Sequence, residues 1–254
     1  MAEKWDHTQK KHFDLNVNEY TKMYDEIYED TFHFRYLFNS FVNFLELEKG
    51  SKILEIGGGT GRYSLPLLKQ GYKLYELDLS KESLDSLKQL SKEFGLASML
   101  EGIILATGDK IPLRKCSFDA AICIHLLHHV PDIKKVVNEM SKVVREGGTV
   151  VCLEPNPLCP YWYFSIPLSG LKKWSVEKGL VRCSEHNLKN IFRSYGLIDI
   201  QIEKQGFIPP ALMDSSVFRN FCVMLDNKLS SAKIPFINTF SAVHFIKGTK
   251  GIIR

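Results

Sequence analysis

A short apolar run followed at once by a glycine-rich turn constrains the fold of this chain more than any other feature. The run ILEI occupies residues 53–56 and is typical of a strand buried in a parallel sheet. The sequence GGGTG follows at residues 57–61, where glycine opens backbone angles that other residues avoid. An amphipathic segment comes next. The order predicts a strand, a tight loop and a helix, with a ligand lying against the bare backbone of the loop and facing the positive end of the helix dipole.

The spacing of the glycines distinguishes two kinds of cofactor loop. A dinucleotide-binding loop has the spacing G-x-G-x-x-G, which would place a third glycine at position 62, but Arg62 stands there. Glycines occupy positions 57, 59 and 61 instead, and a glutamate precedes them by two residues. This pattern resembles motif I of the class I S-adenosylmethionine (SAM) methyltransferases, whose loop wraps the amino-acid part of SAM. The resemblance assigns cofactor binding to Glu55, Gly57, Gly58, Gly59 and Gly61. A glycine-rich turn without a ligand is the alternative.

A carboxylate closes the next predicted strand, which spans residues 73–77. Asp78 follows that strand about 20 residues after the glycine loop, where a carboxylate can accept hydrogen bonds from both ribose hydroxyls. The competing role for Asp78 is the N-cap of the following helix, but Ser80 can fill that role. Glu76 competes for the ribose, although it lies inside the strand. We therefore assign the ribose to Asp78, with Leu79 beside it.

A third stretch, residues 108–132, reads GDKIPLRKCSFDAAICIHLLHHVPD. It resembles the third and fourth strand ends of small-molecule methyltransferases of the type 11 kind. The resemblance implies that Asp109 accepts a hydrogen bond from the adenine amino group, and that backbone near Ile124 faces the methionine part of SAM. The cofactor residues that it implies in this stretch are Gly108, Asp109, Lys110 or Ile111, Ile124 and His125. From the residues alone, Asp109 could also be a turn residue. The resemblance covers residues 45–155 well and the rest loosely.

Helical and strand patterns alternate from residue 52 to residue 154, which is typical of a parallel doubly wound sheet. We expect an α/β fold with a doubly wound, mostly parallel seven-stranded sheet, the Rossmann-like methyltransferase fold, with N-terminal helices and a lid of helices and loops. A chain of 254 residues, 44% of them hydrophobic, can bury one large core. A helix is expected at residues 134–144, ended by Gly147 and Gly148.

Segments outside the alternating core are expected to cover the cofactor. We divide the chain into an N-terminal helical lid at residues 1–47 and a SAM-binding methyltransferase domain at residues 48–254, with insertions at about 155–183 and 207–235. Ligands of open α/β sheets bind beyond the carboxyl ends of the strands, where these insertions emerge. Prolines predict a non-helical loop at residues 154–164. We expect Tyr20 to contact the cofactor. The residues expected to contact the acceptor are Tyr24, Asn156, Tyr161, Trp162, Tyr163 and Phe207. The alternative for the aromatic residues is ordinary packing.

Three histidines follow the fourth predicted strand, near the expected position of the methyl group. Methyl transfer requires geometry and exclusion of water, and it requires a base only where the acceptor must lose a proton. Histidine titrates near neutral pH, so His125 and His128 are the candidate catalytic bases, whereas His129 is expected to pack. The family usually has glutamate where His128 stands, and all three histidines could instead only shape the site. We expect no metal, because no third ligand stands at a fitting spacing.

Composition and charge limit the partners of the chain. The 33 basic and 29 acidic residues give a net charge of +4, which is too balanced to predict a polyanionic partner. The six cysteines form no C-x-x-C pair, so we expect reduced thiols and a cytoplasmic protein. The first twenty residues are polar and charged, so no signal peptide is expected. No apolar run reaches the about 20 residues that cross a bilayer, so no stable membrane insertion is expected.

The sequence therefore predicts an enzyme that transfers a methyl group from SAM to oxygen, nitrogen or carbon of a small molecule, leaving S-adenosylhomocysteine (SAH). The acceptor classes considered are a sugar or lipid-linked intermediate, a quinone-like ring and other small metabolites. Residues 154–164 resemble methyltransferases of surface-glycan assembly, which is a weaker likeness than the SAM motifs. The alternatives are a SAM-binding sensor or scaffold without turnover and, less favoured, a nucleic-acid methyltransferase, which would need a basic stripe or a recognition module. The sequence does not predict an oligomeric state.

Overall fold

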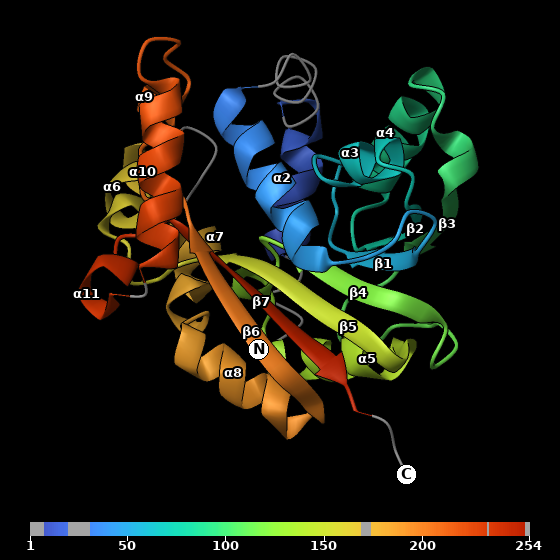
Figure 1. Ribbon diagram of the computed structural model, residues 1–254. Helices are drawn as coiled ribbons and strands as arrows, with labels where there is room; N and C mark the ends of the chain where they lie inside the picture. The colour runs from blue at the N-terminus through green and yellow to red at the C-terminus, as the bar shows by residue number, and fades with distance from the viewer. Residues whose placement is uncertain (1–7, 20–30, 169–173, 233, 252–254) are drawn as a thin grey trace.

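A seven-stranded sheet runs through the computed structural model, which describes residues 8–19, 31–168, 174–232 and 234–251 (Figure 1). The strand order is β3-β2-β1-β4-β5-β7-β6. The strands are β1 (Lys52–Ile56), β2 (Lys73–Asp78), β3 (Leu100–Leu105), β4 (Phe118–Ile124), β5 (Val144–Pro155), β6 (Leu197–Gln205) and β7 (Val243–Lys250). Strands β1 to β5 pair in parallel, whereas β7 lies antiparallel between β5 and β6. The expected mostly parallel α/β fold is confirmed.

Helices cover both faces of the sheet (Figure 1). One face packs against α2 (Phe32–Leu45), α3 (Ser64–Lys69) and α4 (Lys81–Glu93), and the other packs against α5 (Ile133–Val143) and α8 (Glu185–Ser194). Successive residues of β1 point to opposite faces, so Ile53 joins the first core and Leu54 joins the second. Residues 8–19 are also helical. In the described parts of the chain, no helix has the length and apolar content needed to cross a membrane.

Polar residues begin the main helices. Ser80 accepts a hydrogen bond from the Ser83 amide (3.1 Å) and caps α4, as the sequence predicts. Asp132 caps α5, and Ser184 caps α8. Because Ser80 fills the cap of α4, Asp78 keeps its place at the end of β2 for another role.

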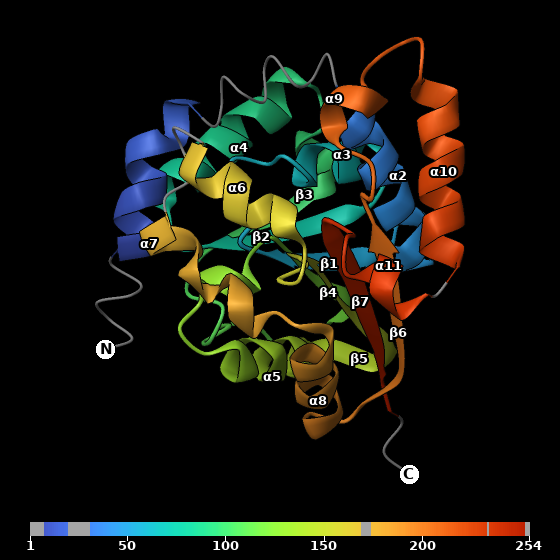
Figure 2. The ribbon, with the colours of Figure 1, turned by 90° about the vertical axis from the view of Figure 1, so that its left-hand side faces the viewer.

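Two groups of short helices extend from the carboxyl side of the sheet. The first group follows β5 and comprises α6 (Pro160–Leu168), α7 (Trp174–Glu177) and the 3₁₀ helix η3 (Lys178–Arg182). The second follows β6 and comprises α9 (Pro210–Met213), α10 (Arg219–Ser231) and α11 (Pro235–Asn238). Two further 3₁₀ turns are η1 (Ala97–Met99) and η2 (Leu127–His129). Figure 2 shows α6, α9, α10 and α11 on one side of the molecule. The assignment of residues 1–47 to a lid stays a prediction.

Two expectations about local structure are wrong. Residues 160–168 form a helix rather than a non-helical loop, because Pro160 occupies the first helical position, where a missing N–H is tolerated, and Pro167 falls in the last turn. The helix α5 ends at Val143 and β5 begins at the next residue, so the two glycines at 147 and 148 lie within the strand instead of ending the helix. A Cβ on Gly148 would lie 2.8 Å from the Asp119 carbonyl oxygen, so close strand packing explains the glycine there.

Candidate active site

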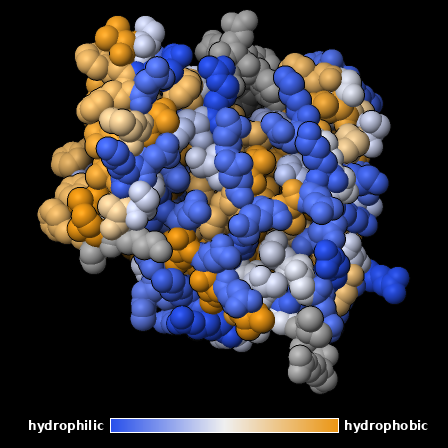
Figure 3. Space-filling view, viewed as in Figure 1, coloured by the Kyte–Doolittle hydropathy of each residue, from blue (hydrophilic) through white to orange (hydrophobic). Residues whose placement is uncertain are grey.

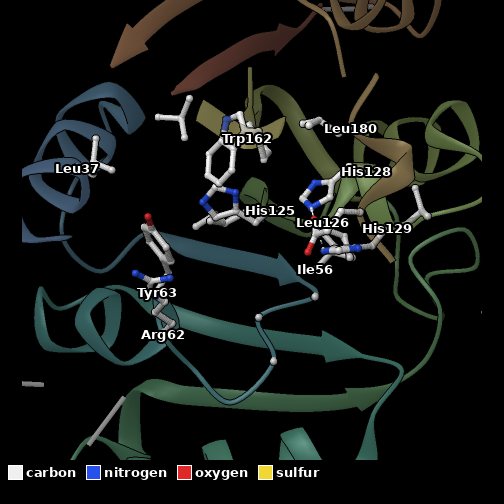
Figure 4. Close-up of a pocket in the computed structure, with 18 of the residues that line it drawn as sticks. Leu37, Ile56, Arg62, Tyr63, His125, Leu126, His128, His129, Trp162 and Leu180 are labelled. Carbon is white, nitrogen blue, oxygen red and sulfur yellow. Dashed lines mark ion pairs between the residues drawn. The ribbon is translucent and has the colours of Figure 1, made fainter. Parts of the chain in front are cut away.

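A cavity of about 590 Å³ lies at the carboxyl ends of β1, β2 and β4 (Figure 4). Small-molecule sites commonly measure ~300–1,000 Å³. The glycine loop and the residues that follow β2, β3 and β4 supply one set of lining groups, and the helices α2 and α6 and residues 206–210 supply another. The cavity thus lies at the sheet edge where the sequence predicts the ligand.

The glycine loop presents bare backbone to the cavity. Gly59 has a φ of +61°, and a Cβ at that position would meet no atom within 4 Å, so the loop leaves open space there. The Gly58 amide donates to Glu76 Oε1 (2.8 Å), and the Gly59 amide donates to Asp78 Oδ2 (3.0 Å). A Cβ on Gly58 would lie 2.4 Å from Glu76 Oε1, so the loop and this carboxylate fit together only with glycine.

Two carboxylates of β2 compete for the ribose in the sequence, and the structure places them differently. Glu76 is fully buried, also accepts from the Ser64 hydroxyl (3.0 Å) and does not line the cavity, so it braces the loop. Asp78 lines the cavity, while its two oxygens accept from the Gly59 and Ser80 amides. Burial raises the pKa of the Asp78 carboxyl. The carboxylate at the strand end is therefore the one that a ligand can reach.

Glu55 and Asp109 add further carboxylates to the cavity wall. Burial raises the pKa of Glu55 to about 7, and its Oε2 has no hydrogen-bond partner among the described residues. A buried carboxylate oxygen without a partner is unfavourable, so a cationic ligand group would stabilise it. Asp109 accepts from the Thr107 hydroxyl (2.7 Å) and lines the cavity beside it. These carboxylate acceptors fit SAM, which carries a sulfonium and an amino group together with hydroxyls that donate hydrogen bonds.

The segment after β4 carries a buried histidine held between two carboxylates. His128 Nδ1 lies 2.6 Å from Glu154 Oε2, and His128 Nε2 lies 3.2 Å from Glu177 Oε2. Glu154 also accepts from the Leu126 and Leu127 amides at 2.9 and 2.7 Å, which fixes the turn η2. Burial lowers the pKa of His128, but the two carboxylates outweigh burial and raise the pKa to about 9. His128 is therefore protonated at neutral pH.

No third metal ligand stands at a fitting spacing in the sequence, but the fold brings a third donor to the histidines. The expectation of no metal stays a prediction. Donor atoms of His128, His129 and Glu177 lie within 4.8 Å of one another, and Glu177 comes from α7, far away in the sequence. A metal bound at Nε2 of His128 would have to displace the proton that the two carboxylates hold on this ring at neutral pH. Burial, followed by the charge of His128, lowers the pKa of His129 to about 3, so this ring stays neutral.

Aromatic side chains from several segments line the same cavity. They are Phe13, Phe34, Tyr63, Tyr161, Trp162, Phe207 and Phe240. The Trp162 indole N–H donates to the Ala242 carbonyl (2.6 Å), which fixes the plane of the indole ring. Figure 4 shows Tyr63, His125 and Trp162 projecting into the space between α2 and the strand ends. The cavity therefore combines carboxylates with a large apolar surface.

The structure gathers most of the predicted site residues around this cavity. Those that line it are Glu55, Gly57, Gly58, Gly59, Asp78, Leu79, Gly108, Asp109, Ile124, His125, His128, Tyr161, Trp162 and Phe207. Gly61, Lys110, Asn156 and Tyr163 do not line it. The Asn156 side chain is buried and donates to the Ser241 carbonyl (3.0 Å), and the Tyr163 hydroxyl donates to the Pro157 carbonyl (2.8 Å). These placements give Asn156 and Tyr163 structural roles. Tyr20 and Tyr24 lie outside the described residues.

Sequence reasoning missed several lining residues. Tyr63 and Arg62 follow the glycine loop directly and line the cavity together with Glu177. Glu154 lies next to the cavity in the penultimate position of β5, where it binds the turn η2. The position of Glu154 near a strand end, like that of Asp78, was a usable signal. Glu177 gave no signal, because only the path of the segment after β5 brings it to His128.

Comparisons with known proteins agree with the site. A family model described as a methyltransferase domain matches residues 54–152. The demethylmenaquinone methyltransferase of Geobacillus sp. (strain WCH70) is 30% identical over 183 residues, which cover 64% of this chain and 77% of that protein. The fold is similar to a Thermotoga maritima SAM-dependent methyltransferase, described as a possible histamine N-methyltransferase, with a TM-score of 0.66, 18% identity and coverage of 95% of this chain and 99% of that chain.

A second solved structure, phosphoethanolamine N-methyltransferase 2 of Haemonchus contortus in complex with SAM, has a TM-score of 0.60 and 15% identity, covering 85% of this chain and 52% of that chain. The glycine spacing distinguishes this loop from a dinucleotide loop. The match to the Geobacillus relative covers 77% of that protein. The chain therefore belongs to the class I SAM-dependent methyltransferases.

Proposed function

We propose that the enzyme methylates a small apolar molecule with a planar ring, the class of acceptor that the name demethylmenaquinone methyltransferase indicates for the Geobacillus relative. The observation that carries the proposal is the continuity of the cavity, in which the glycine loop and its carboxylates line the same space as aromatic side chains. Planar apolar rings pack favourably against aromatic side chains. A free sugar would need partners for its hydroxyls, whereas the lining residues from α6 and positions 206–210 are mostly apolar.

We assign each carboxylate of the cavity to a different part of the cofactor. SAM, when bound, supplies a methyl group activated by its positively charged sulfur. We assign the amino group of the cofactor to Glu55, whose Oε2 lacks a partner among the described residues. Asp78 would accept the ribose hydroxyls, and Asp109 would accept from the adenine amino group. Apolar neighbours such as Leu126 line the cavity beside these groups and exclude water from it.

His125 is the better candidate for a base. His128 is protonated at neutral pH and faces a carboxylate at each ring nitrogen, so it positions the turn η2 rather than accepting a proton. His125 lines the cavity directly after β4 and has a φ of +53°. This conformation is uncommon for residues other than glycine, and such strain is frequently kept at functional sites. A neutral His125 would take a proton from the acceptor as the ring or its oxygen is methylated.

Production of SAH from SAM tests the proposal with three mixtures: a demethylated naphthoquinol with a short prenyl chain, a sugar nucleotide, and no acceptor. We expect SAH above background only with the naphthoquinol. Replacing Trp162 by Phe keeps an aromatic ring and removes the bond to Ala242, so Trp162→Phe should raise the KM of the acceptor more than the KM of SAM.

A variant of His125 and a matched control test its role as the base. Asn tolerates a left-handed backbone, so His125→Asn should lower kcat roughly 100-fold while the Kd of SAM stays unchanged. His186→Asn, at an exposed histidine of α8, should leave the rate unchanged. Production of SAH with the sugar nucleotide but not with the naphthoquinol would contradict the proposal and indicate a sugar acceptor. Binding of SAM without turnover of any acceptor would favour a sensor.

A further inference from the structure

Exposed apolar side chains are concentrated on one side of the molecule. In the described residues, fourteen of the twenty exposed large hydrophobic side chains come from positions 158–174 and 212–240. We call this set the aromatic face: Leu158, Tyr161, Tyr163, Phe164, Leu168, Trp174, Leu212, Val217, Phe218, Phe221, Met224, Ile234, Phe236 and Phe240. Figure 3 shows hydrophobic residues gathered over α9, α10 and α11, and Figure 2 shows α6 on the same side. A surface of this extent normally has a binding partner.

Helix α10 shows that these side chains are not misplaced core residues. Its inward face is defined by Cys222 and Asp226, which are buried. Phe218, Phe221 and Met224 recur at three-residue spacing on the exposed surface, with 46–59% of each side chain accessible. The helix therefore has an apolar stripe directed away from the protein in addition to the side that packs on it.

The charge of the same segments is strongly one-sided. Positions 155–182 and 207–240 contain seven Lys or Arg residues and three Asp or Glu residues, an excess equal to the formal charge of +4 of the whole chain. The three acids are bound internally: Asp226 by the amides of residues 206–208, Asp214 by the His33 amide, and Glu177 by His128. Among the basic residues that the structure describes here, Arg182 donates to the Val130 and Pro131 carbonyls, whereas Lys228 is exposed on α10. In sequence, the segments that carry the aromatic face therefore have an excess of basic over acidic residues.

The aromatic face is continuous with the cavity. Tyr161 and Phe240 are each about half exposed and also line the cavity, and Trp162 and Phe207 lie beside them in its wall. An apolar acceptor dissolved in lipid could pass from this surface into the cavity without crossing water. This part of the argument rests on the proposed function.

We propose that the aromatic face docks the enzyme on the surface of a bilayer that contains anionic phospholipids. Aromatic side chains favour the boundary between headgroups and acyl chains, and basic side chains are attracted to anionic headgroups. A second copy of the chain fits the surface less well, because a two-fold contact would bring the basic segments of both copies together. Anionic lipid complements both the apolar and the basic character of the face.

Flotation of the full chain with vesicles tests this proposal. One vesicle preparation contains phosphatidylcholine alone, and the other also contains phosphatidylglycerol. We expect binding to the anionic vesicles that weakens with added salt, and little binding to the neutral ones. The double variant Phe221→Ser, Phe236→Ser should bind about tenfold less, because it removes exposed apolar area that the bilayer would bury.

Matched controls distinguish binding through the aromatic face from nonspecific hydrophobic adsorption to vesicles. Phe94→Ser with Leu105→Ser alters two exposed apolar residues elsewhere and should bind as the wild type does. Lys228→Glu should weaken binding more than Lys88→Glu, since both lysines are exposed but only the first belongs to α10. Melting temperatures should stay within a few degrees for all these variants, since the side chains are exposed.

Two results would overturn the proposal. One is equal binding of wild type and double variant to anionic vesicles. The other is a wild-type protein that is dimeric in light scattering and a double variant that is monomeric, because the face would then join two copies of the chain. Vesicle binding does not depend on turnover, so a protein that binds anionic vesicles but methylates no ring would contradict only the proposed function.

Discussion

Asp78 connects the glycine loop to the ligand at the scale of a single residue. Asp78→Asn keeps the size of the side chain but removes its charge and one acceptor oxygen. A hydrogen bond to a charged group contributes ~1.5–3 kcal/mol, so we expect the Kd of SAM to rise at least about tenfold by calorimetric titration. Asp85→Asn, at an exposed position of α4, is the control. An unchanged Kd in a folded Asp78→Asn protein would show that Asp78 does not bind the ribose.

His128 predicts a pH dependence of stability. Its folded-state pKa is raised to about 9 from 6.5, so its contribution is complete below pH 6.5 and is lost as the pH rises through 9. The variant His128→Gln has no titratable ring, so it lacks this pH-dependent contribution to stability. The free energy of unfolding of the wild type should therefore fall relative to the variant between pH 6.5 and pH 9, by on the order of 3 kcal/mol. Urea unfolding of both proteins across this range measures the difference, and parallel curves would contradict the buried ion pairs.

Single residues also show where sequence reasoning ends. The glycine loop and Asp78 were predictable because each belongs to a local pattern of strand, turn and helix. The pairing of His128 with Glu177 was not, because the two residues are 49 positions apart and meet only through the course of the segment after β5. Without Glu154 and Glu177 in view, His128 and His125 looked equally suitable as bases.

At the scale of elements, one buried carboxylate joins α10 to the cavity wall. Asp226 accepts from the amides of Gly206, Phe207 and Ile208 and from the Tyr36 hydroxyl (2.9 Å) on α2. Asp226→Ala would leave several buried donors without an acceptor, at roughly 1–3 kcal/mol for each. We expect a loss of at least about 3 kcal/mol in urea unfolding, whereas Asn220→Ala on the exposed side of α10 should cost almost nothing. Equal stabilities would show that α10 is not held by this residue.

The elements differ in how well the sequence predicts them. Helices such as α4 and α8 have a capping serine and an apolar stripe, which are local signals. The helix α6 has neither and contains Pro167, so its prolines favoured a loop. Apolar residues occur around α6 without forming a clear stripe. Ile166 is buried, and Trp162 packs against the core that α2 also joins. Packing that no local pattern reveals determines its structure.

At the scale of the whole molecule, the alternation of helices and strands predicted the sheet but not the order of its last strands. Strand β7 enters antiparallel between β5 and β6, and its Lys247 donates to the Phe44 carbonyl at the end of α2 (3.0 Å). A cation at a helix C-terminus is stabilising, and here it joins residues 203 positions apart. Such contacts are invisible in the chain order. The cavity at the sheet edge depends on both sets of strands, since Val243 of β7 also lines it.

Calorimetric titration of the ligand-free protein with SAH and, separately, with NAD tests the central claim most directly. The glycine spacing, the open backbone at Gly59 and the cluster of carboxylates predict one SAH bound per chain and no measurable heat from NAD. Prior addition of SAH should also abolish the heat of SAM binding, because both use the same cavity. Binding of NAD with no response to SAM or SAH would contradict the account.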